Sequence, residues 1–181
     1  MTGLRTIAML VAAAILALSA GYATHWLLAG HLPAAGNVSD ASDVEALFAT
    51  RFPDLDGEHT SISRWRGKVM VVNFWATWCT PCREEIPSFV QIQDEFSGKN
   101  VQFVGIAADQ ADKVSAFSRE IQVNYPLLIG NMAALDLSVK LGNRISALPF
   151  TVVIDREGHL VHRQLGILKP DKLRQLLVKL G

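Results

Sequence analysis

The chain contains very little cysteine, and this scarcity excludes several kinds of site. Only two cysteines, Cys79 and Cys82, occur among its 181 residues. A structural zinc site needs two further ligands at finger-like spacing, but no second cysteine pair exists and the five histidines are scattered. A haem attachment site needs a histidine directly after the second cysteine, and Arg83 stands there. The pair is therefore expected to hold neither zinc nor haem.

The chain also lacks blocks of charge, internal repeats and nucleotide-binding motifs. Its 17 Lys and Arg residues balance its 17 Asp and Glu residues, so the formal net charge is zero. A chain without a basic patch offers no electrostatic footprint for nucleic acid, which we exclude as a partner. No nicotinamide or flavin motif is present, so we expect no cofactor and no metal. Electrons must then come from a partner protein.

Charge is absent from a long run near the N-terminus. After Arg5, none of residues 7–30 is formally charged, and as a helix this run would span about 36 Å, enough for a bilayer core. A cleaved signal peptide would end near Ala20 or Ala23, where small residues allow cleavage. The apolar continuation beyond those sites, with Trp26 suited to the membrane interface, favours an uncleaved anchor. Either alternative puts the remaining chain outside the cytoplasm.

Composition divides the chain into three expected parts. Residues 1–30 are the signal anchor or signal peptide, residues 31–43 are a linker of small and polar residues, and residues 44–181 form one domain. Half of the chain is hydrophobic, which is ample for a core. We expect a single-pass protein of the inner membrane, whose domain lies in the periplasm or an equivalent extracytoplasmic space.

The stretch around the cysteines combines a strand, a tight loop and a helix. The apolar run 69–72 predicts a buried strand, and apolar residues spaced three or four apart predict a helix ending near Gly98. The cysteines then start that helix, where about half a positive charge and unpaired N–H groups stabilise a thiolate. We expect Cys79 to attack a substrate disulfide and Cys82 to resolve the mixed disulfide. Pro81 lacks an N–H that the first helical turn does not need.

A static structural disulfide is the alternative for this pair. A bridge between two residues three apart closes almost no loop, and would stabilise the folded chain very little. The strand before the pair and the helix after it instead favour a redox-active pair.

The stretch 73–87, which reads Asn-Phe-Trp-Ala-Thr-Trp-Cys-Thr-Pro-Cys-Arg-Glu-Glu-Ile-Pro, resembles the thioredoxin superfamily. It is most similar to the TlpA/ResA-like branch of membrane-associated, extracytoplasmic thiol–disulfide oxidoreductases, and the resemblance covers the chain from about Phe52 to its end. It implies an α/β thioredoxin-like fold, in which helices flank a central mixed sheet, with an N-terminal hairpin and a single N-terminal membrane-anchor helix.

The remaining sequence alternates strand and helix patterns, as an α/β sandwich requires. Apolar runs predict four further strands, and residues 156–158 predict the turn of a hairpin between the last two. Amphipathic spacing predicts three further helices, the first of them with Asp109 and Asp112 at its start. The strands are expected at residues 101–107, 125–129, 148–155 and 160–165, and the helices near residues 109–121, 132–141 and 169–180.

The resemblance also assigns a substrate face. Pro149 matches the position of the superfamily's cis-proline, and it would place the backbone of Leu148 beside Cys79, where an extended client could add as a strand. Trp78 and Pro81 complete this expected substrate-binding surface. An ordinary trans-proline at the start of a strand is the alternative for Pro149.

A carboxylate next to the pair is expected to move a proton. Asn73 occupies the position of a buried Asp in thioredoxins proper, and Asn cannot take a proton. Glu85 lies one turn beyond Cys82, and ResA-like proteins have Glu at the matching place. A buried Glu85 would have a raised pKa and could accept the proton of Cys82. In the alternative, Glu85 is exposed and only complements the helix dipole.

These features predict a membrane-tethered thiol–disulfide oxidoreductase that mainly reduces protein disulfides. The residues between the cysteines include no histidine or other cation, which favours a reducing pair. The resemblance implies disulfide-bonded or dithiol client proteins, in cytochrome c maturation or copper-site assembly, and a membrane electron donor. Two alternatives stay open. A thiol peroxidase would need a cysteine outside the pair, and a copper-binding assembly module would need a further His or Met beside it.

Overall fold

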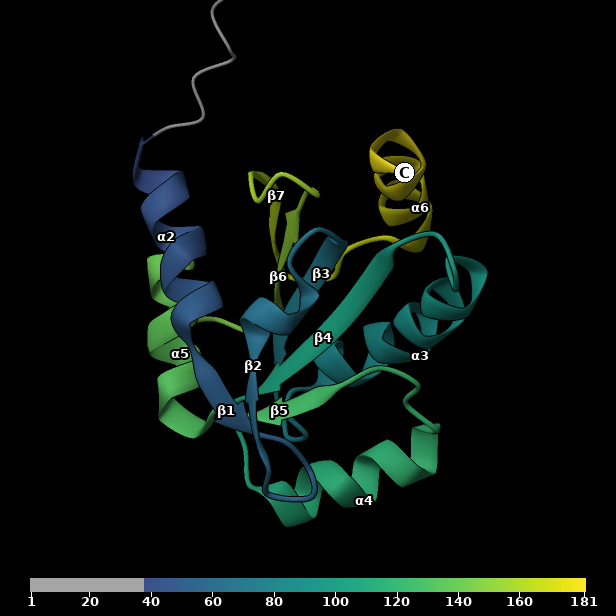
Figure 1. Cartoon of the computed structure of the whole chain (residues 1–181). Helices are drawn as coiled ribbons and strands as arrows, with labels where there is room; N and C mark the ends of the chain where they lie inside the picture. The colour runs from purple at the N-terminus through teal and green to yellow at the C-terminus, as the bar shows by residue number, and fades with distance from the viewer. Residues whose placement is uncertain (1–37) are drawn as a thin grey trace, which may run out of the picture. The chain divides into compact units, whose positions relative to one another are not determined.

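The computed structural model describes residues 38–181, which form an α/β domain around a five-stranded sheet (Figure 1). In chain order its elements are α2 (Val38–Ala49), β1 (Arg51–Pro53), β2 (His59–Ser61), the 3-10 helix η1 (Ile62–Trp65), β3 (Val69–Trp75), α3 (Thr80–Glu95), β4 (Val101–Ala107), α4 (Ala111–Ile121), β5 (Leu127–Ile129), α5 (Asn131–Lys140), β6 (Phe150–Ile154), β7 (Leu160–Leu165) and α6 (Pro170–Leu180).

The sheet is mixed, as the family resemblance implied. Its strand order is β5-β4-β3-β6-β7, in which β3, β4 and β5 run parallel to one another. Strand β6 is antiparallel to both of its neighbours, β3 and β7. Helices α3 and α4 supply the crossovers that successive parallel strands need. The expected thioredoxin-like arrangement of a central mixed sheet and flanking helices is confirmed.

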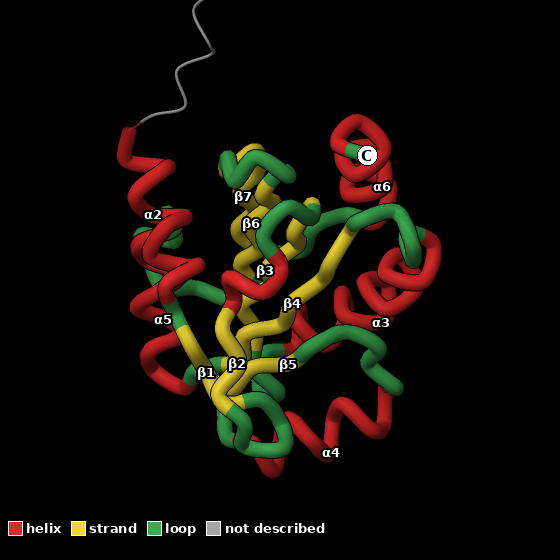
Figure 2. The backbone as a smooth tube through the Cα atoms, viewed as in Figure 1, coloured by secondary structure: helices red, strands yellow, loops and turns green. Residues whose placement is uncertain are grey.

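The central strand β3 is buried on both faces, because helices cover both sides of the sheet. Figure 2 shows α2 and α5 on one side of the sheet and α3 and α6 on the other. Val71 and Trp75 pack in a cluster with side chains of α3, α4 and α6, whereas Val72 and Phe74 pack against α2 and α5. By this alternation Asn73 points to the α3 side. A polar side chain is thereby placed within the core, beneath the helix that carries the cysteines.

Helix α2 begins earlier than the sequence indicated. Residues 38–43, which we assigned to the linker, are helical, because tertiary contacts stabilise a segment whose composition resembles a linker. Asp40 lies in the first turn, where a carboxylate complements the helix dipole, and it forms an ion pair with Arg163 of β7. Leu47 is completely buried against the sheet. The helix is therefore part of the domain.

The segment after α2, where we expected an N-terminal hairpin, contains β1 and β2. These two short strands pair antiparallel as a separate sheet, with Phe52 opposite Thr60. Asp54 stabilises the turn between them, because its carboxylate accepts the backbone N–H groups of Asp56 and Glu58.

Within residues 38–181, none of the helices is long and apolar enough to cross a bilayer. The expected signal anchor or signal peptide at residues 1–30 lies outside the described residues, as does the expected linker up to residue 37.

Candidate active site

The two cysteines form a disulfide at the N-terminus of α3. Cys79 is the N-cap residue, and its Sγ accepts the backbone N–H of Cys82 at 3.3 Å. This is one of the N–H groups that a helix leaves unpaired at its start, and the sulfur takes the place of a capping oxygen. Pro81 lies in the first turn, as expected. The local sequence therefore places the sulfur of Cys79 at the positive end of a 16-residue helix.

The two sulfur-bearing residues differ in their access to solvent. Cys79 is 6% exposed, whereas Cys82 is completely buried. The flanking residues Trp78 and Thr80 are both exposed, and 66% of Trp78 is accessible. A substrate can therefore approach this bridge only from the side of Cys79.

The bond between Leu148 and Pro149 is cis, as the superfamily match implied. Phe150 follows it and pairs with Phe74 near the end of β3, so Pro149 lies at the same end of the sheet as the cysteine loop. Half-buried Leu148 packs against the hydrophobic cluster that contains both cysteines. The carbonyl of Pro149 accepts the N–H of Gly166 at 2.8 Å. Pro149 thus lies at the same end of the sheet as Cys79, which is 70 positions earlier in the chain.

Glu85 is buried beside the pair, which rules out the exposed alternative. Only 3% of Glu85 is accessible, and it lies three residues after Cys82, on the same face of α3. Asn73 Nδ2 donates to its Oε1 at 2.8 Å, and the backbone N–H of Leu168 donates to its Oε2 at 3.0 Å. Burial raises the pKa of Glu85 to about 7, although both hydrogen bonds act to lower it. Its carboxyl can therefore gain or lose a proton near neutral pH.

Asn73 connects this carboxyl to the neighbouring strand. Its Nδ2 also donates to Thr151 Oγ1 at 2.9 Å, across the register that sets Asn73 opposite Thr151. The Oδ1 atom of Asn73 is buried and has no hydrogen-bond partner within residues 38–181. Sequence reasoning missed Thr151 and Leu168, because neither belongs to a motif and each meets the site only through the tertiary fold.

Asp109 is a second functional candidate that sequence reasoning placed wrongly. We expected it at the start of a helix, but α4 begins later and Asp109 is 7% exposed. Its carboxylate accepts the backbone N–H and the hydroxyl of Thr77, two residues before Cys79. An acid that follows an apolar strand and precedes a helix is equally typical of a cap, so the sequence alone could not assign this contact.

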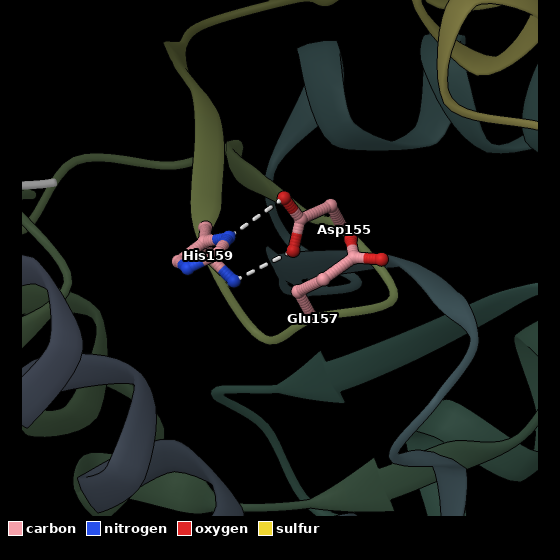
Figure 3. Close-up of side chains that lie close together, drawn as sticks. All are labelled: Asp155, Glu157 and His159. Carbon is pink, nitrogen blue, oxygen red and sulfur yellow. Dashed lines mark hydrogen bonds and ion pairs between the residues drawn. The ribbon is translucent and has the colours of Figure 1, made fainter. Parts of the chain in front are cut away.

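A metal ion could be held by Asp155, Glu157 and His159, the one such cluster among residues 38–181 (Figure 3). The Asp155 carboxylate already stabilises the turn between β6 and β7, because its Oδ1 accepts the N–H of His159 at 2.7 Å. Its Oδ2 lies 3.1 Å from His159 Nδ1. Since β6 starts beside Pro149 and ends before this turn, the cluster lies at the opposite end of the strand from the cysteines. It does not supply the ligand that a copper module would need beside the pair.

A thioredoxin-like fold with a disulfide-forming Cys-x-x-Cys at a helix start, together with relatives that are named for this chemistry, defines a thiol–disulfide oxidoreductase. The chain belongs to the AhpC/TSA family, whose model matches residues 40–163. The resemblance to ResA-like proteins is confirmed by the individual relatives.

Two curated relatives and one solved structure illustrate the similarity. The chain is 29% identical over 127 residues to the thioredoxin-like protein YneN of Bacillus subtilis, covering 68% of this chain and 71% of that protein. It is 28% identical over 130 residues to the thiol-disulfide oxidoreductase ResA of Bacillus cereus, covering 70% and 72%. The crystal structure of a thiol:disulfide interchange protein from Chlorobium tepidum matches with a TM-score of 0.66 at 28% identity, covering 72% of this chain and 92% of that one.

Proposed function

We propose that this oxidoreductase is an extracytoplasmic, membrane-tethered reductase of protein disulfides. Its uncharged N-terminal run supports the tether, because residues 7–30 include none of the charges that a bilayer core excludes. The domain would work in the periplasm, at the surface of the inner membrane. A cleaved signal peptide would give the same compartment without the tether.

The reaction begins with the Cys79 thiolate and a client disulfide. Cys79 attacks one client sulfur, so that a Cys79–client bond forms while the client's own S–S bond breaks and its second sulfur leaves as a thiolate. Cys82 then loses its proton and attacks Cys79, forming the enzyme disulfide and releasing the client's other thiolate. Two electrons have passed from the enzyme dithiol to the client. The different accessibility of the two sulfurs supports this order.

The observation that carries the proposal is the buried carboxyl of Glu85 on the Cys82 face of α3. A resolving thiol that is completely buried cannot pass its proton directly to water. A carboxyl with a pKa of about 7 is matched to that task, because near neutral pH it is available both as a base and, after the transfer, as an acid. Asn73 and Leu168 hold the two oxygens of this group in place.

Clients would bind at the end of the sheet that carries the cysteine loop. An extended client segment would run past Pro149 and pair with the backbone of Leu148, as strands add to one another elsewhere. Pro81 and the exposed indole of Trp78 would contact the client next to its cysteine. Hydrogen bonds between backbones do not depend on the side chains of the client. This suits an enzyme that acts on several disulfide-bonded or dithiol proteins.

The direction of electron flow follows from the residues between the cysteines. Thr80 and Pro81 bring no cation to stabilise the Cys79 thiolate further, so the dithiol remains a good reductant, with thioredoxin's potential of about −270 mV as the guide. A membrane protein would then return electrons to the enzyme. Clients in cytochrome c maturation or in copper-site assembly are the ones that the sequence resemblance to the TlpA/ResA-like branch implies.

Cysteine substitution tests the proposal directly. The reduced Cys82→Ser variant, mixed with a disulfide-bonded client, should stall as a covalent complex, because Cys79 attacks and nothing resolves the mixed disulfide. The matched Cys79→Ser variant should form no complex. The same two variants, expressed in a native envelope, would identify the clients by the proteins they retain. Tight copper binding by the reduced protein, with no trapped client, would instead favour a copper-binding assembly module.

A further inference from the structure

The carboxylate of Asp109 joins the two loops that leave the central strands. These loops begin side by side, because the carbonyl of Trp75 accepts the N–H of Ala108 at 2.8 Å. Beyond that point, Asp109 Oδ2 accepts both the backbone N–H of Thr77, at 3.0 Å, and the Thr77 hydroxyl. Its Oδ1 accepts the N–H of Gln110 at 2.8 Å. Three donors from two loops thus converge on one buried side chain.

Thr77 belongs to the loop that carries the reactive cysteine. The backbone N–H of Cys79 donates to the carbonyl of Ala76 at 3.2 Å, which closes a tight turn over Thr77 and Trp78. The turn is compact, so fixing one of its residues fixes the rest. Asp109 fixes Thr77 at two atoms, and thereby sets where Cys79 meets the start of α3.

This arrangement requires a carboxylate at residue 109. Burial disfavours the ionised form of Asp109, yet the hydrogen bonds from Thr77 and Gln110 outweigh it and lower its pKa, so the group is charged at neutral pH. An ionised carboxylate accepts at both oxygens. An amide would turn an NH2 group toward one of the N–H donors, and would break the connection on one side.

We propose that Asp109 is a positioning residue for the redox reaction: acting through Thr77, it holds Cys79 at the N-cap of α3, where the helix stabilises its thiolate. This inference rests on the proposed function only in taking Cys79 as the attacking sulfur. Loss of the positioning contact and loss of the negative charge would shift the pKa of Cys79 in opposite directions. An anion near Cys79 disfavours the thiolate, so removing the charge alone would lower the pKa of the thiol, whereas releasing the loop would raise it.

The test uses the full chain with Cys82→Ser, in which Cys79 is the only thiol. The rate of Cys79 alkylation, measured against pH, gives the pKa of this thiol. The rate of its reaction with glutathione disulfide measures how fast it attacks a disulfide. Thr77→Val and Asp109→Asn should each raise the pKa of Cys79 and slow its attack at pH 7 about tenfold, and together they should do little more. Thr77→Ser, which keeps the hydroxyl, and Asp112→Asn, which removes a nearby exposed acid, should match the Cys82→Ser chain without a further substitution.

Either of two results would overturn the inference. One is a lowered pKa of Cys79 in Asp109→Asn, which is the sign of a charge effect. The other is a Thr77→Val variant that behaves like Thr77→Ser, and this pair decides the question even if Asp109→Asn fails to fold. The proposed function fails separately: it fails if Cys79 is an ordinary thiol before any substitution in the loop.

Discussion

A carboxyl group in an apolar core has consequences for stability as well as for catalysis. The pKa of Glu85 is raised from 4.5 to about 7, so between these pH values the folded protein keeps a proton that the unfolded chain releases. The free energy of unfolding should therefore fall as the pH rises through this window, with a total loss of about 3 kcal/mol by pH 8. Below pH 4.5 the loss is absent, because both states are protonated.

Glu85→Gln should remove this pH dependence from the oxidised protein. Urea unfolding at pH 4.5, 6 and 8 measures it as the difference between the variant and the original chain, which isolates the contribution of one carboxyl from all others. Equal pH dependence in the two proteins would mean that Glu85 titrates normally.

The same variant should slow release of a preformed mixed disulfide about 100-fold, since Cys82 then lacks its base.

Asn73 tunes this carboxyl. Its hydrogen bond favours the ionised form, so Asn73→Ala should raise the pKa of Glu85 further above its present value. The rate of mixed-disulfide release, plotted against pH, should then have its midpoint above 7. Thr151→Ser keeps an acceptor for Asn73 and serves as the control, with an unchanged midpoint. A midpoint that moves down in Asn73→Ala would contradict this role.

At the scale of single residues, the sequence predicted the reactive residues better than the residues that hydrogen-bond to them. The reactive residues could be predicted from the spacing of Cys79 and Cys82 and from the superfamily match at Pro149, because motif residues lie close together or at a recognised position. Leu168 is 83 positions from the oxygen it contacts. Periodicity reports which face of an element is buried, but it does not report which distant backbone group meets that face.

At the scale of elements, α2 is the part whose role differs most from expectation. Leu47→Ala should lower the free energy of unfolding by about 3 kcal/mol, because it removes a completely buried side chain from the core of the domain. Glu45→Ala, on the exposed face of the same helix, removes only a surface ion pair with Arg66 and should leave stability nearly unchanged. Thermal or urea unfolding compares the two variants. Equal, small effects would mean that α2 is only loosely attached.

The remaining strands and helices followed their sequence patterns closely, since buried runs and amphipathic spacing are strong where helices cover both faces of a sheet. Strand β4 matches its expected bounds, residues 101–107. Helix α2 differed because its first turn is polar and small, and its ion pair with Arg163 arises only in the folded chain. The start of α4 differed because Asp109 contacts Thr77 and does not cap the helix.

At the scale of the whole molecule, the chemistry and the location of the protein depend on different parts of the chain. All of the residues assigned to the site lie within residues 38–181. A chain in which a cleavable signal peptide replaces residues 1–37 should therefore exchange disulfides in solution at the same rate as the full chain, but should appear in the soluble envelope fraction when the full chain stays with the membrane. Cell fractionation tests the predicted location, and a measured rate of disulfide exchange tests the predicted chemistry independently. A full chain found in the soluble fraction would favour cleavage over anchoring.

The decisive measurement is the pKa of the Cys79 thiol in the reduced protein. Its alkylation rate, measured against pH, should show a thiolate that forms well below the pKa of about 8.5 of an ordinary free cysteine, because the sulfur caps the start of α3. A midpoint near 8.5 would mean that the N-terminus of α3 does not stabilise the Cys79 thiolate, and Cys79 would then not be an activated nucleophile.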